Sequence, residues 1–162
     1  MVGLAALNAI QDIATAAAGM STTEALLASN LAPLQARRDM AMLGLIHRAV
    51  LRKGPSQFWG IFSRDHAATR TKHSRTIKEY ECDETDFELP GSRPAAYIQR
   101  SALGLAAVYN LLPERVVAHN TVASFQSEMQ NMLKHAAATQ ESWEHIFSPR
   151  TQRHNHPLRQ WV

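Results

Sequence analysis

The sequence predicts an all-α fold, with about six helices in an irregular bundle and a charged irregular insertion between two helical halves. Apolar residues recur every three or four positions in both halves, which is the spacing of a helix that buries one face. A composition of 45% hydrophobic and 19% charged residues, with only seven glycines and seven prolines, is typical of a globular protein with a packed core. The 162 residues are enough for a single domain, which we expect to span residues 1–148.

The first helical half, residues 4–62, begins with two predicted helices. Residues 4–18 have helical spacing, and Gly19 provides a natural stop. Ser21 lies three residues before Glu24, a spacing at which each side chain can bond the backbone amide of the other residue at a helix start. A short second helix therefore begins here.

The same half contains its longest helix after Pro33, because proline is tolerated at a first helical position. The apolar pattern continues to Lys53, and Gly54-Pro55 then breaks it. Pro55 also begins a further short helix through Trp59 and Phe62.

Residues 63–93 form the charged insertion, and apolar residues nearly vanish between Ser63 and Lys78. Basic residues come first and acidic residues follow, with the change between Lys78 and Glu79. A partial two-residue alternation near this change is too irregular to predict a strand. We therefore expect a charged loop that joins the two helical halves.

The second helical half, residues 94–147, starts with helical spacing up to Tyr109. Pro113 then begins a short helix, and Thr121 caps a strongly amphipathic one. Residues 149–162 are basic and poorly patterned, so we expect a flexible tail. Four aromatic residues stand at core-like positions, which leaves Trp59 and Trp161 without an assigned role; the four are Tyr109, Phe125, Trp143 and Phe147.

Four arginines share about a third of the circumference of the helix after Pro33 and form an arginine face: Arg37, Arg38, Arg48 and Arg52. No acidic residue on this face relieves the repulsion between Arg48 and Arg52. A guanidinium binds planar oxyanions through paired hydrogen bonds. The face therefore suits either carboxylates from elsewhere in the fold or the phosphates of RNA or DNA, and the composition favours neither.

The basic part of the insertion is a second candidate for phosphate contacts. Flexible basic segments follow a nucleic-acid backbone without reading its bases. The contacts that we predict here are Arg70, Lys72 and Arg75. The alternative is that the acidic run from Glu79 to Glu88 neutralises this basic segment.

The sequence shows no signature of catalysis. It lacks a nucleophile elbow, a phosphate-binding glycine loop and a pair of adjacent aspartates. The single cysteine, Cys82, excludes an internal disulfide and a cysteine-rich zinc site, and it fits an intracellular protein of the cytoplasm or nucleus. The histidines lack the spacing of zinc ligands, so we predict no metal and no other cofactor. No apolar run has the length that a membrane span needs, so we expect no membrane partner.

Two blocks of the sequence resemble the region after the polymerase core in reverse transcriptases of non-LTR, LINE-type retrotransposons. In the first block, STTEALLASNLAPLQARRDMAMLGLIHRAVLRKGP, a Thr-x-x-x-Leu-Leu helix leads to Pro-Leu-x-x-Arg-Arg. In the second, RSALGLAAVYNLLPERVVAHNTVASFQSEMQNMLK, an aromatic-Asn-x-Leu-Pro turn from Tyr109 to Pro113 precedes a helix with Thr121 and Phe125 in the place of the family's Ser-x-x-x-Phe. The two blocks have the order of the family and cover the chain from about Leu4 to Lys134.

The resemblance implies a thumb-like, post-polymerase region that helps to hold template RNA and target DNA, with the rest of a reverse transcriptase as a partner. The polymerase core with its catalytic aspartates, an endonuclease domain and a Cys-His knuckle are absent, so the chain is not expected to be an enzyme by itself. It also has Tyr109 where the family often has tryptophan, and Gln126 where the family has lysine. The rival interpretation is a helical protein-interaction or scaffold module with no nucleic-acid role, whose arginines pair with acidic groups.

Overall fold

The computed structural model describes residues 12, 13, 16, 19, 21–29, 31–65, 73–79, 101–139, 143–151 and 153–161. Its α-helices are α2 (Thr22–Ala28), α3 (Leu34–Val50), α4 (Gln57–Ile61), α6 (Leu105–Tyr109), α7 (Glu114–Val117) and α8 (Val122–Thr139). Three 3-10 turns follow, η2 (Trp143–His145), η3 (Arg153–Asn155) and η4 (Pro157–Trp161). These ranges contain no β-strand, and an isolated antiparallel bridge joins Arg64 to Ile77. The prediction of an all-α fold is confirmed.

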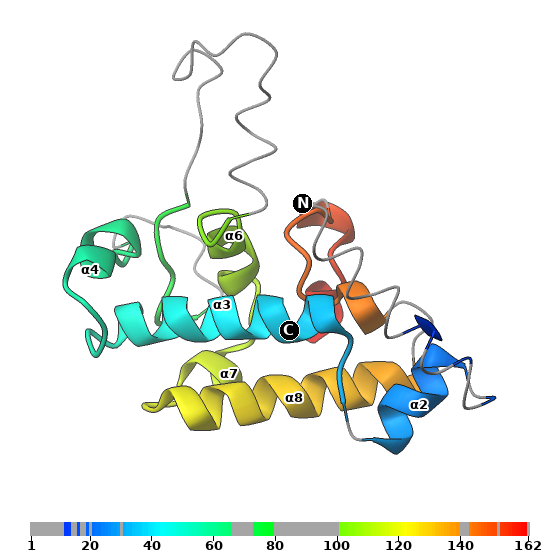
Figure 1. Cartoon of the computed structure of the whole chain (residues 1–162). Helices are drawn as coiled ribbons and strands as arrows, with labels where there is room; N and C mark the ends of the chain where they lie inside the picture. The colour runs from blue at the N-terminus through cyan, green and yellow to red at the C-terminus, as the bar shows by residue number, and fades with distance from the viewer. Residues whose placement is uncertain are drawn as a thin grey trace, which may run out of the picture.

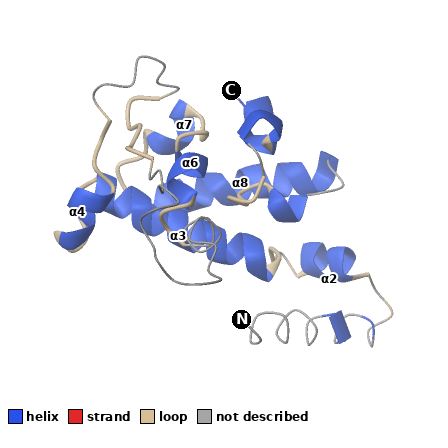
Figure 2. Ribbon diagram, turned by 90° about the horizontal axis from the view of Figure 1, so that it is seen from above, coloured by secondary structure: helices blue, strands red, loops and turns tan. Residues whose placement is uncertain are grey.

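The centre of the molecule is the pair formed by α3 and α8, which lie side by side and run in opposite directions (Figure 1 and Figure 2). Leu43 and Ile46 of α3 and Phe125 and Met129 of α8 are fully buried. The two helices come close at Gly44, where an added Cβ atom would lie 2.6 Å from Nε2 of Gln126. α6, α7 and η2 pack on this pair and complete the core.

The helix starts agree with the capping signals in the sequence. The Glu24 amide donates to Oγ of Ser21 at 3.2 Å, and the Ser21 amide donates to Oε2 of Glu24 at 3.0 Å. Oγ1 of Thr121 accepts the Ser124 amide at 3.1 Å at the start of α8. Both side-chain caps satisfy amides that have no partner within the helix.

Some helix boundaries differ from the predicted ones. α3 ends at Val50, three residues before the predicted end at Lys53. α6 begins only at Leu105, and residues 94–100 lie outside the described residues. The predicted helix over residues 4–18 is described only at Asp12, Ile13 and Ala16, which are helical.

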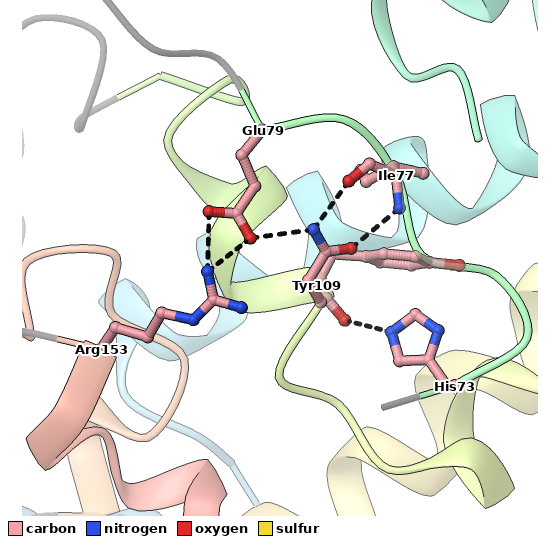
Figure 3. A network of polar contacts seen from close by, with 6 residues as sticks. His73, Ile77, Glu79, Tyr109 and Arg153 are labelled. Atoms are coloured by element: carbon pink, nitrogen blue, oxygen red, sulfur yellow. Dashed lines mark hydrogen bonds and ion pairs between the residues drawn. The ribbon is translucent and has the colours of Figure 1, made fainter. Parts of the chain in front are cut away.

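The segment 73–79 is fastened to the end of α6 by the side chain of Asn110. Oδ1 of Asn110 accepts the Ile77 amide at 3.0 Å, and Nδ2 donates to the Ile77 carbonyl at 2.8 Å. Nearby, Nε2 of His73 donates to the Tyr109 carbonyl at 3.1 Å (Figure 3). Asn110 thus gives Ile77 the two bonds that a neighbouring β-strand would give it, and Ile77 is buried.

The end of the chain packs against the helices, in contrast to the flexible tail predicted from the sequence. Leu158 is fully buried, and so is nearly all of His156, whose Nε2 donates to the Ser148 carbonyl at 3.2 Å. Arg153 forms an ion pair with Glu79 at 2.9 Å (Figure 3). Short 3-10 turns carry no repeated 3.6-residue pattern, which is why the sequence did not indicate this packing.

Candidate nucleic-acid interface

The carboxyl end of α3 carries an arginine in a conformation that glycine usually adopts. The Arg52 amide donates to the Ala49 carbonyl at 2.9 Å, and the Lys53 amide donates to the Arg48 carbonyl at 3.0 Å. This bond pair defines a Schellman motif, in which the residue after the cap is left-handed. Arg52 is that residue, with φ of 55°. A non-glycine residue in this conformation costs about 1–2 kcal/mol, so the chain retains an arginine here against a local penalty.

Arg52 lies on the wall of a basic groove between the end of α3, α4 and the turn before α8. The groove has a volume of about 550 Å³. Its charged lining residues are Arg52, Arg64 and Arg75, and none of its lining residues is acidic. The side chains of Arg52 and Arg64 have no hydrogen-bond or ion-pair partner among the described residues.

Trp59 adds an aromatic surface to the same groove. Its side chain is 38% exposed, and its indole N–H donates to the Gly54 carbonyl at 3.1 Å. The bond fixes the ring from one edge and leaves part of its surface open. A partly exposed indole beside unpaired guanidinium groups is the combination that stacks a base and binds the adjacent phosphate in single-strand binding proteins.

Two further cations hold the groove together. Nη1 of Arg75 donates to the carbonyls of Val117 and His119 at 2.6 Å each, and Nη2 donates to Oδ1 of Asn120 at 2.7 Å. Nζ of Lys53 donates to the Asn120 carbonyl at 2.6 Å. These bonds join the segment 73–79 and the end of α3 to the turn between α7 and α8, so the arginines lie on fixed backbone.

Beneath the groove lies a buried and uncharged polar cluster. Nε2 of His47 faces the His119 carbonyl at 2.9 Å, and Nδ1 lies 3.0 Å from the Tyr109 hydroxyl. Because a carbonyl only accepts, Nε2 carries the proton and Nδ1 accepts from Tyr109. Burial lowers the pKa of His47 to about 4 and raises the pKa of Tyr109. The cluster is therefore neutral near pH 7. The ring of His47 stacks on Phe125, with the two ring centroids 4.1 Å apart.

The structure separates the seven residues that the sequence predicted as contacts. Arg52 and Arg75 line the groove. Arg48 lies beside it and donates from Nε to the Lys53 carbonyl at 3.2 Å. Arg37 and Arg38 lie near the opposite end of α3, where Nη2 of Arg38 donates to Oε1 of Gln35 at 3.0 Å. Arg70 and Lys72 lie outside the described residues.

The predicted arginine face is therefore not continuous. Because α3 ends at Val50, Arg52 does not extend the helical row that Arg48 occupies. The guanidinium of Arg75 donates hydrogen bonds to three acceptors of the protein itself, and the residue is half-buried. It positions the turn and has little capacity left for a phosphate.

Sequence reasoning did not select Arg64 and Trp59 as contacts. Arg64 stands at the head of the basic segment, and its antiparallel bridge to Ile77 brings it to the groove. Trp59 was left without a role because a short helix gives little periodicity from which to read its direction. The signal available in the sequence was a tryptophan in a short segment without apolar periodicity. In the structure, the helix that carries Trp59 has no buried residue.

The acidic run is described only at Glu79. Its carboxylate pairs with Arg153 near the end of the chain and accepts from Nδ2 of Asn110 at 3.0 Å. Within the described residues Glu79 therefore neutralises the chain end, and it has no bond to the basic segment 73–78.

The described part of the chain contains no group of three or more His, Cys, Asp or Glu side chains that could hold a metal ion. Nor does any described helix have the length and apolar character to cross a membrane.

Comparisons with protein-family models, curated proteins and solved structures found no match to the chain.

Proposed function

We propose that this chain is a non-catalytic nucleic-acid-binding module that contacts the phosphates of RNA or DNA through the basic groove. The observation that carries the proposal is Arg52, which has a left-handed conformation and whose side chain has no partner among the described residues. Strained residues concentrate at functional sites, because folding alone would favour a glycine at that position. Arg64, whose side chain has no partner among the described residues, and the partly exposed Trp59 lie in the same groove.

The groove favours nucleic acid over the scaffold alternative for an electrostatic reason. A scaffold arginine that pairs with the protein's own acidic residues would have a carboxylate near it, and none of the described residues that line the groove is acidic. The phosphates of RNA or DNA accept paired hydrogen bonds from arginine side chains. The contacts proposed are Arg52 and Arg64, with Arg48 and Lys53 at the edge of the groove.

We also propose that the module belongs to the post-polymerase region of a non-LTR retrotransposon reverse transcriptase. The support is the ordered pair of sequence blocks, together with the use that the fold makes of their residues. The aromatic-Asn-x-Leu-Pro turn contains the fully buried Tyr109 and the Asn110 that fastens segment 73–79. The genomic sequence upstream tests this part: it should encode a polymerase core with its catalytic aspartates, intact or as a remnant, and an unrelated upstream sequence would contradict it.

Fluorescence anisotropy with labelled single-stranded RNA, single-stranded DNA and duplex DNA tests the binding. Measurements from about 50 to 300 mM salt should give a linear fall of log K with log salt. The Arg52→Gln/Arg64→Gln variant should reduce the slope by about 1.4 on single strands or about 1.8 on duplex, which is the loss of two phosphate contacts. Folded protein that binds none of the three probes at low salt would contradict the proposal and leave the scaffold module.

A charge-matched variant separates groove binding from general attraction. Arg150→Gln/Arg159→Gln removes the same two charges from exposed positions outside the groove, and we expect an unchanged slope. A further variant, Arg37→Gln/Arg38→Gln, tests the contacts that the sequence predicted at the other end of α3. If this variant loses as much slope as the groove variant, the phosphate path extends along the whole helix.

A further inference from the structure

The start of α3 lies beside the end of α8 at the other end of the central pair (Figure 1). Residues of both helix ends line a second cavity. Its volume is about 390 Å³, which falls in the range of small-molecule sites. Leu31, Met40 and Leu133 provide an apolar wall. Leu31 is 46% exposed, whereas Met40 and Leu133 are buried, so Leu31 provides the open part of this apolar wall.

Two cations lie at this cavity without an acidic partner. Arg37 of α3 and Lys134 of α8 both line it and both are exposed. None of the lining residues is acidic, and neither cation has a hydrogen-bond or ion-pair partner among the described residues. An apolar wall with two unpaired cations is complementary to a molecule with an apolar body and one anionic end.

Trp143 provides an independent observation at the same cavity. Its side chain is 3% exposed and forms part of the cavity wall. Its indole Nε1 is buried, and no described residue accepts its hydrogen. Buried N–H groups are nearly always bonded, so the unpaired indole N–H marks a place in this wall where a ligand or a water molecule would find a donor.

We propose that this cavity binds a small amphipathic carboxylate, a monocarboxylic acid with a short hydrocarbon or aromatic body. The apolar body lies against Leu31, Met40 and Leu133, and the carboxylate pairs with Arg37 and Lys134. A volume of about 390 Å³ accommodates a body of the size of octanoate. This site is separate from the basic groove, so the proposal does not depend on nucleic-acid binding.

Titration of the ¹⁵N-labelled full chain with octanoate tests the proposal, followed by NMR of the indole N–H signals. Trp143→Phe identifies the signal of Trp143 among the three tryptophans. We expect a saturable shift of that signal with Kd between about 10 μM and 1 mM, the range for a ligand of this size. Octanol and octylamine keep the body but lose or reverse the charge, and they should bind at least about tenfold more weakly.

Variants then locate the site. Arg37→Gln and Lys134→Gln should each weaken octanoate about two- to fivefold, whereas Arg159→Gln, an exposed position that does not line the cavity, should leave its Kd unchanged. Ala32→Phe places a ring on the half-buried lining of the cavity and should abolish the shift, with thermal unfolding confirming that the variant is folded. The proposal is wrong if saturating octanoate leaves the Trp143 signal in place, if octanol binds equally well, or if both charge variants retain the wild-type Kd.

Discussion

His47 is the residue whose chemistry most constrains the interior. Its ring is fully buried between Tyr109, Phe125 and the His119 carbonyl, and both ring nitrogens are bonded. Burial lowers its pKa from 6.5 to about 4. The unfolded chain therefore binds a proton at this residue in a pH range where the folded chain does not, so stability is complete above pH 6.5 and falls as the pH decreases towards 4.

This linkage gives a quantitative prediction. The free energy of unfolding should decrease by about 2 kcal/mol between pH 7.5 and 5, and by about 3 kcal/mol at pH 4, from His47 alone. Burial lowers the pKa of His73 as well, which adds to the loss in the same direction. Urea unfolding at a series of pH values measures it. His47→Gln should remove the His47 share of the decrease between pH 7 and 5, whereas the exposed His135→Gln should leave the profile unchanged. Equal profiles in all three proteins would refute the assignment.

Asn110 is a residue whose two side-chain functions can be separated. Its oxygen accepts the Ile77 amide, and its nitrogen donates to the Ile77 carbonyl and to Glu79. Asn110→Ala leaves the buried Ile77 groups unpaired and should cost about 2–4 kcal/mol of unfolding free energy. Asn110→Asp keeps the acceptor, loses the donor and brings a carboxylate next to Glu79, so it should also destabilise near neutral pH but recover part of the loss at pH 4. An aspartate variant as stable as the wild type at pH 7 would contradict this role.

At the scale of elements, the end of α3 shows a trade-off: Arg52 lowers the stability of the fold but provides a proposed contact to RNA. Arg52→Gly removes a side chain from a left-handed position, and it should raise the unfolding free energy by about 0.5–1 kcal/mol, or the melting temperature by about 1–4 °C. Arg52→Ala keeps the unfavourable conformation and should leave stability nearly unchanged. Both variants should weaken RNA binding alike, because both lose the guanidinium. Thermal unfolding and anisotropy on the same three proteins test this, and a glycine variant less stable than the alanine variant would show that no strain is present.

The elements that the sequence predicted well are those with a local physical cause. The capping residues at Ser21 and Thr121 and the proline before α7 act on the first turn of the following helix, so spacing alone reveals them. The end of α3 was misplaced because its stop comes from an arginine in the left-handed conformation, where sequence rules expect glycine. Because glycine and proline end helices, the Gly54-Pro55 pair predicted a helix end a few residues after the observed one.

The candidate site could be predicted only in part, because it forms at the scale of the whole molecule. Arg52 and Trp59 are near one another in sequence, but Arg64 and Asn120 reach the groove through the bridge to Ile77 and the turn before α8. Charge patterns along one helix gave no means of knowing that Arg37 and Arg52 belong to different cavities at opposite ends of α3. Tertiary contacts between distant segments determine which cavity each arginine lines, and local periodicity does not reveal those contacts.

The packed end of the chain gives the last prediction at this scale. Removal of residues 153–162 takes away the fully buried Leu158 and the buried His156, and the truncated chain should lose at least about 3 kcal/mol, or about 6–12 °C in melting temperature. Leu158→Ala in the full chain should reproduce most of this loss, because the cavity that it leaves lies in the same core. Arg153→Gln should cost less than about 1 kcal/mol, since its ion pair with Glu79 is exposed to solvent. A truncated chain with the melting temperature of the wild type would support the flexible tail that the sequence predicted. The expected loss would instead make residues 153–161 a part of the fold, which any shortened variant for binding studies must keep.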